Sequence, residues 1–541
     1  MNFTFFKLST RAMWFVLIIF LCANCSKNSK TLDELVGESQ IIGDEPVTDG
    51  PAGAVTFNDM LGVNAFEWNF GTQNNPTDPE RSQFFQPFAG VRHYLDWRQI
   101  EPEKEKYGYN PSARGGWKYD EIYEWCKQQN ITVLACIKTI PDWLIDTYPE
   151  DKRDAENVPA KYGADLSDPA SYLDFGKLAF QYAARYGSNT KVDSSLVRVE
   201  PIPHYNPNQK RIGTGLVQYI ECNNEPNRWW KPDKVATQTA SEYAANLSAF
   251  YDGHKGALGP DVGVKTADPN MQVVMGGIAA ADPAYVQEMI DWCEKHRGRR
   301  ADGSVDLCFD IINYHHYSHN RDEVKRRADQ RGIAPELSDA ADLAQGFVEL
   351  ARTSAYNIPV WNTEVGFDVS QLSVQKAIPI GNKSALMTQA DWNLRTALLY
   401  ARTGVSKLFF YMLHDVDINS TLQYASSGFV DEVGGYSARP SWYYMAQAKN
   451  LIGDFYYNQT VNADPIVDEY VLGDKKIYVL VVPDEKGRTA DYTLKLGSQV
   501  KQVKIHTLLP DQPTAASATK SVNKGEIKLT VSETPMFVEI I

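Results

Sequence analysis

Two glutamates stand at the ends of predicted strands in similar sequence contexts. Glu225 follows the apolar run 219–222 and two asparagines, and a proline comes directly after it. Glu364 closes a second run, 358–363, and is followed by a valine and a glycine. Cleavage of a glycosidic bond with retention needs two carboxyl groups, one to protonate the leaving oxygen and one to attack the anomeric carbon. The two glutamates could supply both groups if the strands bring them together.

The chain around the glutamates alternates short apolar runs with longer helical patterns, beginning near residue 57. This alternation is typical of repeated βα units that build a parallel sheet. Asp168 and Asp282, each followed by proline, are typical helix starts, and a long helical pattern stops before Gly404. Eight such units predict a (β/α)8 TIM barrel, an α/β fold whose active sites lie at the carboxyl ends of the strands. The predicted strands are 61–67, 90–96, 132–138, 216–223, 272–278, 309–315, 359–363 and 407–413.

Beyond about residue 455 the helical period disappears, and short strand-like runs are separated by turn residues. We therefore predict that the catalytic barrel covers residues 51–454 and that a small C-terminal antiparallel β-sandwich, an accessory domain, covers 455–541. The clearest of its strand-like runs are 477–482, 492–496, 503–508, 527–531 and 536–541.

The N-terminal segment has the pattern of an export signal. Two basic residues precede the apolar run 12–21, which is too short to span a bilayer as a helix. Cys25 resembles the lipid-attachment cysteine of bacterial lipoproteins, although Asn24 replaces the small residue that usually precedes it. We predict a lipoprotein signal peptide over 1–25 and a flexible tether over 26–50. The protein would then be exported and lipid-anchored to a bacterial membrane, at the periplasmic or surface face of the outer membrane; the alternative is ordinary signal cleavage and a soluble exported protein.

The composition excludes several classes of partner. The formal net charge is −14 and Lys and Arg form no large cluster, so a nucleic-acid partner is not expected. The 12 Trp and 29 Tyr are enough for a large core and for stacking against a carbohydrate substrate. No cofactor or metal is expected, because the histidines in 315–319 lack a carboxylate at ligand spacing and 415–419 lacks the glycine and glutamate of a calcium loop. Among the later cysteines, only Cys293 and Cys308 form a plausible disulfide pair.

Asn224-Glu225-Pro226 and Thr363-Glu364 resemble the fourth-strand and seventh-strand motifs of the clan A glycoside hydrolases, with families 5 and 39 the most similar. The resemblance covers about residues 57–452. It implies that Glu225 is the general acid/base and Glu364 the nucleophile of a retaining enzyme. The implied reaction is hydrolysis of β-glycosidic bonds in an oligo- or polysaccharide by double displacement.

Other strand ends fit the same resemblance. It implies that Arg92 orients the carboxylate of Glu364, and a charged bond would also keep this carboxylate ionised. It implies that either His316 or Tyr317 hydrogen-bonds the nucleophile. At the last strand the chain has Tyr411 where the clan commonly has a tryptophan, so Tyr411 is expected to form the floor of the sugar site.

Residues next to the glutamates are expected to bind the sugar. The amide of Asn224 can hydrogen-bond the sugar 2-hydroxyl, a contact that strengthens as the oxocarbenium ion forms. Glu221 is a competing acid, which we expect inside the barrel with a cation or a hydroxyl as its partner. Five tryptophans lie near predicted strand ends, namely Trp68, Trp97, Trp143, Trp229 and Trp230, and some of them should stack against sugar rings. We assign this role to Trp68, Trp143 and Trp229.

Two alternatives share parts of this pattern. A non-catalytic glycan-binding protein could use the barrel as a binding surface, but binding alone does not require two acids at matched strand ends. A transglycosidase would use the same residues and transfer the sugar to an acceptor instead of water. The sequence does not specify the sugar, because barrels of this kind host many specificities through loop variation.

Overall fold

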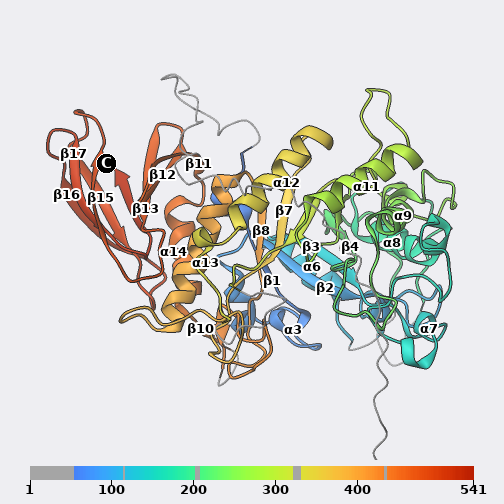
Figure 1. Cartoon of the computed structure of the whole chain (residues 1–541). Helices are drawn as coiled ribbons and strands as arrows, with labels where there is room; N and C mark the ends of the chain where they lie inside the picture. Colours follow the sequence, from blue (N-terminus) through green and yellow to red (C-terminus); the bar gives the residue numbers. More distant parts are fainter. Residues whose placement is uncertain (1–53, 114–115, 201–207, 321–329, 432–434) are drawn as a thin grey trace, which may run out of the picture.

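The computed structural model describes residues 54–113, 116–200, 208–320, 330–431 and 435–541, and Figure 1 shows the course of the chain. The predicted signal peptide with Cys25 and the predicted tether lie outside these residues. Within them, no helix is both long enough and apolar enough to cross a membrane.

An eight-stranded parallel sheet confirms the predicted (β/α)8 barrel. All eight predicted strands are present: β1 Leu61–Asn64, β2 Gly90–Asp96, β3 Thr132–Lys138, β4 Tyr219–Cys222, β5 Gln272–Met275, β6 Ile312–His315, β7 Val360–Val365 and β8 Lys407–Phe410. They pair in the order β5-β4-β3-β2-β1-β8-β7-β6. Single bridges from Val274 to Ile311 and from Ile278 to Tyr314 join the two edges, so the sheet closes on itself.

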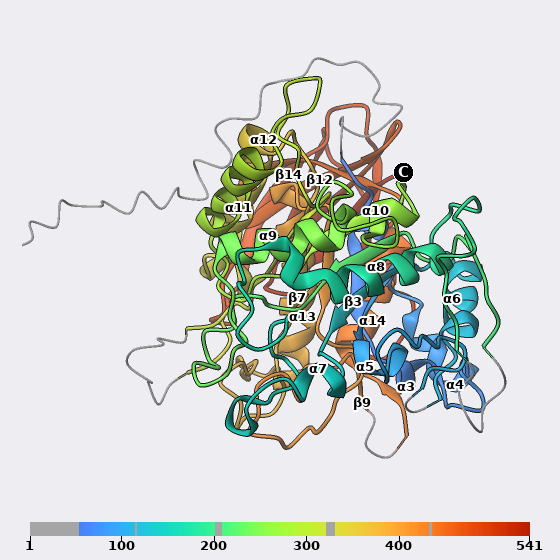
Figure 2. The same cartoon turned by 90° about the vertical axis from the view of Figure 1, so that its right-hand side faces the viewer.

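Helices cover the outside of the barrel. The longer ones are α6 Tyr119–Gln128, α8 Leu173–Tyr186, α9 Ala240–Asp252, α11 Pro283–His296, α12 Ala340–Ser354, α13 Ala385–Thr403 and α14 Pro440–Ile452. The short α-helices, of about one turn each, are α2 Phe57–Met60, α3 Glu67–Phe70, α4 Pro79–Ser82, α5 Trp97–Ile100, α7 Asp142–Ile145 and α10 Val264–Ala267. The 3-10 helices are η1 Gln83–Phe85, η2 Glu150–Lys152, η3 Pro169–Tyr172 and η4 Pro335–Leu337. Figure 2 shows α8, α9 and α11 side by side on one flank.

The predicted helix boundaries are confirmed by their capping groups. Asp282 accepts a hydrogen bond from the Ala284 N–H at the start of α11, and Asp168 caps η3, which leads into α8, in the same way. Gly404 ends α13 with a φ of 84°, a left-handed conformation that glycine adopts without a steric penalty.

The inside of the barrel has an apolar layer and, nearer the carboxyl ends of the strands, a polar layer. The apolar layer is formed by Leu134, Val274, Ile311, Trp361 and Phe409, all at most 2% exposed. Buried polar side chains replace them farther up, and these come from five different strands: Asn64, Arg92, Glu221, Asn313 and Thr363. Polar groups without access to water must satisfy their hydrogen bonds among themselves, so the upper layer forms a bonded network.

The described cysteines are buried and free. The Sγ atoms of Cys293 in α11 and Cys308 before β6 lie 3.5 Å apart without a covalent bond. The pairing that the sequence left open is therefore not formed, and these thiols pack as small apolar side chains.

The C-terminal region forms the predicted antiparallel β-sandwich, after a short hairpin of β9 Val430–Asp431 and β10 Ser437–Ala438. A six-stranded sheet in the order β11-β12-β13-β18-β15-β16 packs against a two-stranded sheet of β14 and β17. The strands are β11 Tyr456–Ala463, β12 Ile466–Leu472, β13 Lys475–Val481, β14 Ala490–Lys495, β15 Gln502–Thr507, β16 Ala516–Ser521, β17 Glu526–Val531 and β18 Met536–Ile540. Strands β11, β12 and β16 are not among the predicted runs. All side chains of β16 are exposed and it has no apolar period, whereas β12 is buried along almost its whole length.

The sandwich packs against helices of the barrel, as Figure 1 shows for α13 and α14. Arg402 of α13 pairs with Asp468 of β12 at 2.7 Å. Gln447 of α14 donates to the Leu509 carbonyl at 2.7 Å. Apolar residues of the sheet, such as Phe537, belong to the same core cluster as the barrel. The sandwich therefore supports the outside of the barrel through a continuous core.

Candidate active site

Arg92 is fully buried at the centre of the polar layer. Its Nε and Nη2 donate to Glu221 at 2.7 and 3.0 Å, and its Nη1 donates to Glu364 Oε1 at 2.8 Å. The same guanidinium donates to Asn64 Oδ1 and Asn224 Oδ1 at 2.8 and 2.7 Å. The structure thus agrees with two expectations, because Arg92 contacts Glu364 and Glu221 has a buried cation as its partner.

A β-bulge in β7 turns Glu364 into the barrel. Tyr314 of β6 pairs with Asn362, but the next residue, His315, pairs with Glu364, so Thr363 is an extra residue in β7. Side chains alternate between the two faces of a regular strand, and without the bulge Thr363 and Glu364 would point to opposite faces. With it, the Thr363 hydroxyl and the Glu364 carboxylate both bond groups inside the barrel.

A sharp turn after β4 places Glu225. Asn223 and Glu225 have φ angles of 67° and 45°, a left-handed conformation that is uncommon for residues other than glycine. The Glu225 N–H donates to the Gly277 carbonyl at 3.1 Å, which holds the turn against the chain that follows β5. The Glu225 side chain is 20% exposed, whereas that of Glu364 is 7% exposed. Glu225 is therefore the more accessible of the two acids.

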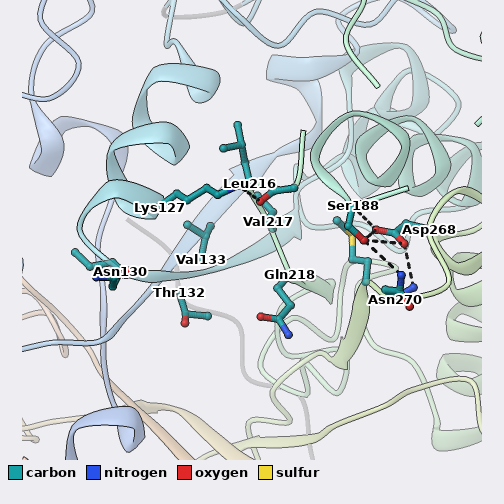
Figure 3. A pocket seen from close by; sticks show the side chains of 13 residues that line it. Lys127, Asn130, Thr132, Val133, Ser188, Leu216, Val217, Gln218, Asp268 and Asn270 are labelled. Atoms are coloured by element: carbon teal, nitrogen blue, oxygen red, sulfur yellow. Dashed lines mark hydrogen bonds between the residues drawn. The ribbon is translucent and has the colours of Figure 1, made fainter. Parts of the chain in front are cut away.

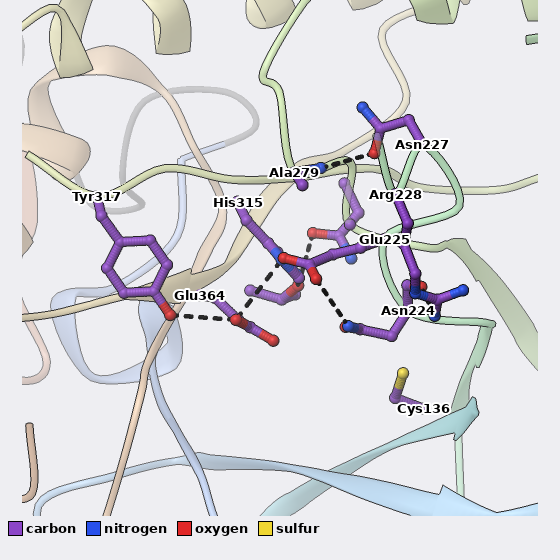
Figure 4. Close-up of polar contacts among 12 residues, drawn as sticks. Cys136, Asn224, Glu225, Asn227, Arg228, Ala279, His315, Tyr317 and Glu364 are labelled. Atoms are coloured by element: carbon purple, nitrogen blue, oxygen red, sulfur yellow. Dashed lines mark hydrogen bonds and ion pairs between the residues drawn. The ribbon is translucent and has the colours of Figure 1, made fainter. Parts of the chain in front are cut away.

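Glu225, His315 and Glu364 converge at the carboxyl ends of β4, β6 and β7 (Figure 4). One carboxylate oxygen of each glutamate and one ring nitrogen of His315 all lie within 4.8 Å of one another. His315 Nδ1 lies 3.0 Å from Glu225 Oε1 and 3.6 Å from Glu364 Oε2. Gly277 leaves room for the ring, since a Cβ there would lie 2.1 Å from His315 Nε2. The separation suits a retaining pair, whose carboxyl groups are about 5–5.5 Å apart.

The surroundings of Glu364 keep it ionised. Burial by itself would raise its pKa, but the positive charge of Arg92, together with hydrogen bonds from Arg92 and Tyr94, opposes burial, and the pKa of Glu364 lies below its usual value of 4.5. Tyr94 donates to Oε1, and Tyr317 donates to Oε2 at 3.1 Å. A carboxylate in this state serves as a nucleophile or a base at neutral pH and not as a proton donor.

Of the two candidates for a hydrogen bond to Glu364, Tyr317 makes it and His316 does not. The expectation that one of the two would bond Glu364 is met by Tyr317, whereas His316 Nε2 lies 3.3 Å from Asp339 Oδ1 and the His316 backbone N–H donates to the Glu364 carbonyl. His315, which was not among the predicted site residues, lies on the inward face of β6 and meets both carboxylates. The alternation of side chains along β6 is the signal that could have identified it.

Asn224 and Tyr411 flank the two carboxyl groups. Asn224 Nδ2 donates to Glu225 Oε2 at 3.3 Å while its Oδ1 accepts from Arg92, so the orientation of the amide is set. Tyr411 follows β8, and its ring centroid lies 6.5 Å from that of Tyr94. Burial raises the pKa of Tyr411, and the nearby carboxylates raise it further. Both residues lie beside the glutamates, in positions compatible with sugar binding.

The three predicted tryptophans lie in different places. Trp229 is 53% exposed and lines a cavity of about 600 Å³ that also contains Glu225. Trp68 is 44% exposed and stacks on Phe66 with ring centroids 4.7 Å apart. Trp143 packs edge-on against another tryptophan and is not among the described residues that line the cavity. Of these three tryptophans, Trp229 is the one that lines the described cavity with Glu225.

Another cavity, of about 520 Å³, lies at the opposite end of the barrel (Figure 3). Its lining residues precede or begin β3, β4 and β5, among them Thr132, Gln218 and Met271. Active sites of (β/α)8 barrels lie at the carboxyl ends of the strands. We therefore assign the chemistry to the cavity that contains Glu225.

A metal ion would compete with existing contacts at the two glutamates. In the described parts of the chain, Glu225, His315 and Glu364 are the one group of three His, Cys, Asp or Glu side chains with ligand atoms close enough for an ion. Arg92 and two tyrosine hydroxyls already donate to Glu364. A guanidinium at 2.8 Å disfavours a second cation there, so we assign these groups to acid–base chemistry.

Comparisons with known proteins agree with this architecture. No family model and no curated protein matches the chain. Among solved structures, the chain is similar to a family 39 glycoside hydrolase from the gut symbiont Bacteroides cellulosilyticus WH2, with a TM-score of 0.60 and 16% identity over 91% of this chain and 82% of that one. The chain has a glycoside hydrolase fold.

Two other glycoside hydrolase structures share this fold. A family 51 arabinofuranosidase from Xanthomonas axonopodis pv. citri has a TM-score of 0.53 and 12% identity, covering 92% of this chain and 98% of that one. A monomeric β-xylosidase from Caulobacter crescentus CB15 has a TM-score of 0.53 and 13% identity, covering 91% and 97%. Families 39 and 51 belong to clan A, so the resemblance predicted from the strand motifs is confirmed at the level of the fold.

Proposed function

We propose that this protein is a retaining glycoside hydrolase that cleaves β-glycosidic bonds, with Glu225 as acid/base and Glu364 as nucleophile. The observation that supports it most is that one carboxylate oxygen of Glu225 and one of Glu364 lie within 4.8 Å of each other at the ends of β4 and β7. An inverting pair would be about 6.5–9.5 Å apart, to admit a water molecule between the acids and the sugar. The shared fold with glycoside hydrolases supports the same assignment.

The proposed reaction is a double displacement. Glu364 attacks the anomeric carbon while Glu225 donates a proton to the leaving oxygen, which takes the electrons of the broken bond. A covalent glycosyl-enzyme remains on Glu364. Glu225, now a carboxylate, then removes a proton from the water that attacks the anomeric carbon. Arg92 positions the nucleophile and, through Asn224, the amide that would meet the sugar 2-hydroxyl.

The cavity beside Glu225 favours an oligo- or polysaccharide as the substrate. Its described lining includes Glu225 but not Glu364, so it lies on the side of the acid and hence of the leaving group. Trp229 and Trp230 line it, are 53% and 41% exposed, and have perpendicular rings with centroids 5.7 Å apart. Exposed aromatic rings offer apolar area for a sugar face at low conformational cost. We infer that a sugar unit of the leaving group binds there.

Product identification tests the proposed function. The purified protein is offered aryl β-glycosides of glucose, xylose, galactose and mannose, and an aryl α-L-arabinofuranoside because one structural neighbour is an arabinofuranosidase. The protein is then offered β-linked oligosaccharides of the sugar whose aryl glycoside it hydrolyses. Proton NMR early in the reaction should show a product with the anomeric configuration of the substrate.

Three other outcomes would each point to a different conclusion. Inversion of configuration would exclude Glu364 as nucleophile. Binding of a glycan that stays intact would favour the non-catalytic alternative. Transfer of the sugar to an added acceptor in preference to water would favour the transglycosidase.

Phenylalanine at position 94 should shift the pH dependence of the reaction. Tyr94→Phe removes one donor to Glu364, so the pKa of Glu364 should rise toward its usual value. A lowered pKa keeps Glu364 ionised as the pH falls, and the acidic limb of kcat/KM should therefore move to higher pH in the variant. Ionised Glu364 stabilises the folded protein above the pKa that Glu364 has in the unfolded state, and this stability is lost as the pH falls through the folded-state pKa. In Tyr94→Phe the loss should occur at a higher pH than in the wild type.

The pH–rate profile on an aryl glycoside that the wild type cleaves measures this shift. Tyr356→Phe is a matched control, because Tyr356 is 54% exposed and lies before β7, at the other end of the barrel. An acidic limb that stays in place in Tyr94→Phe would contradict the role of this hydroxyl.

A further inference from the structure

A continuous chain of hydrogen bonds connects a buried carboxylate to the acid/base. Asn313 Nδ2 lies 3.2 Å from Glu221 Oε1, and Asn313 Oδ1 lies 2.9 Å from the Thr363 hydroxyl. Thr363 Oγ1 lies 3.1 Å from His315 Nε2. The other ring nitrogen, Nδ1, lies 3.0 Å from Glu225 Oε1. This series of hydrogen bonds crosses the barrel from β4 to β6 and β7, and returns through β6 to the turn after β4.

The donors in this chain can be assigned from its buried end. Arg92 donates two hydrogen bonds to Glu221, and the Gly277 N–H donates a third at 3.1 Å, so Glu221 is an ionised acceptor. Asn313 must then turn its NH2 group toward Glu221 and its carbonyl oxygen toward Thr363. An amide oxygen only accepts, and the Thr363 hydroxyl must donate its single proton to it.

This assignment determines the tautomer of His315. Because the Thr363 hydrogen points to Asn313, its oxygen is left as an acceptor, and His315 Nε2 must carry a hydrogen to bond it. The neutral ring then has its lone pair on Nδ1. Two acceptors do not attract each other at 3.0 Å, and the contact between Nδ1 and Glu225 Oε1 therefore requires one proton between them.

We propose that this relay stores the catalytic proton between His315 Nδ1 and Glu225 Oε1. His315, Thr363 and Asn313 are then positioning residues that keep Glu225 in its proton-donating form before the reaction. The inference rests on the proposed function, because it gives the resting state of the acid in that reaction.

The relay fits both halves of the reaction. When the glycosidic bond breaks, its electron pair goes to the leaving oxygen, and that oxygen takes the proton from Glu225 Oε1. His315 Nδ1 retains its lone pair, and Nε2 retains its hydrogen. In the second half, the water that attacks the glycosyl-enzyme returns one proton to Glu225. The resting state is restored without any net change in the relay.

The proton lies among several charged or titratable groups. Glu364 Oε2 is 3.6 Å from His315 Nδ1, and its negative charge favours retention of a proton in the contact. Arg92 opposes it with a positive charge. The groups that face this region are Arg92 and Tyr94 from β2, Cys136 from β3, Glu221 from β4, Tyr317 after β6, Glu364 from β7 and Tyr411 after β8.

Thr363→Val tests the relay. Without the hydroxyl, Nε2 loses its acceptor and the ring is free to carry its hydrogen on Nδ1, where it would donate to the Glu225 carboxylate and favour its deprotonated form. We expect the basic limb of kcat/KM to move about one pH unit lower. On a substrate with a sugar leaving group, the rate at neutral pH should fall on the order of tenfold. The loss should be smaller on a 2,4-dinitrophenyl glycoside, which leaves without a proton.

Matched variants separate this effect from a structural one. Thr363→Ser restores the hydroxyl and should restore both the basic limb and the rate. Thr396→Val is the control, because Thr396 is similarly buried and, within the described parts of the chain, its hydroxyl bonds the Trp392 carbonyl of its own helix. An equal loss on both substrates with an unmoved basic limb in Thr363→Val would overturn the proposal. If the wild type cleaves the dinitrophenyl glycoside and the pH–rate profile of Thr363→Val equals that of the wild type, the relay is contradicted but the proposed hydrolase function is not.

A second measurement does not depend on activity. Nitrogen-15 NMR of histidine-labelled wild type, with His315 assigned by its absence in His315→Gln, reports which ring nitrogen carries the hydrogen. We expect hydrogen on Nε2 throughout the pH range of activity. A neutral ring with hydrogen on Nδ1 would overturn the relay whether or not Thr363→Val folds.

Discussion

Glutamine in place of Glu364 should lower kcat/KM on the order of 10⁴-fold or more, because a neutral amide is no nucleophile for the anomeric carbon. The shape of the side chain is nearly unchanged, and its oxygen can still accept from Arg92 or Tyr94. What is lost is a charge that the structure stabilises, as the lowered pKa of Glu364 shows. The free energy of unfolding should therefore fall by only about 1–3 kcal/mol. Turnover and thermal unfolding are measured on the same preparation.

The control for Glu364→Gln is the same change at an exposed carboxylate. Glu349 has a side chain that is 58% exposed and pairs with Arg352 on α12. Glu349→Gln should have wild-type activity. In addition, Glu364→Gly with azide should yield a glycosyl azide of inverted configuration, since azide would enter from the face that the carboxylate occupied. Near-normal turnover of Glu364→Gln, or an azide product of retained configuration, would contradict the assignment.

Alanine in place of Glu225 should have an effect that depends on the leaving group. General acid catalysis contributes about 10²–10⁴-fold, and a sugar leaving group requires the full contribution. We expect a loss of that size on oligosaccharides. The first step on a 2,4-dinitrophenyl glycoside should be nearly unaffected, because dinitrophenolate leaves unprotonated. The basic limb of the pH–rate profile should also disappear, since the acid that it reports is gone.

Azide provides the complementary test of Glu225→Ala. The glycosyl-enzyme on Glu364 would still form from the dinitrophenyl glycoside, and azide needs no base to attack it. The product should be a glycosyl azide with the configuration of the substrate, formed faster than the hydrolysis product. Glu349→Ala serves as the control for removal of an exposed carboxylate. Equal losses on both substrates, with no effect of azide, would indicate a structural role for Glu225.

The eight barrel strands were predictable because each one is a short apolar run between turn residues and because helical patterns separate them. The same local signals predicted the start of α11 at Asp282 and the end of α13 at Gly404. The strand β16 shows the limit of this approach. Its side chains are all exposed, so it has no apolar pattern, and it is a strand because it pairs with β15 along its whole length.

The candidate site was predictable in part for the same reason. Glu225 and Glu364 each stand at a strand end, and Arg92 lies on a strand of the same barrel, so their meeting follows from the fold. The contact of His315 with both carboxylates did not follow from a motif. It depends on which residue shares the inward face of β6, and the strand pairing decides that.

By itself, the sequence determined the kinds of elements, their order and the two acids at the ends of β4 and β7, because these properties depend on neighbours along the chain. Only the tertiary structure decided how the acids are used. The bulge at Thr363 turns Glu364 inward, and the hydrogen bonds from Glu221 to His315 connect strands that are distant in sequence. Such contacts depend on strand register and on the packing of the whole barrel, which no local stretch of residues specifies.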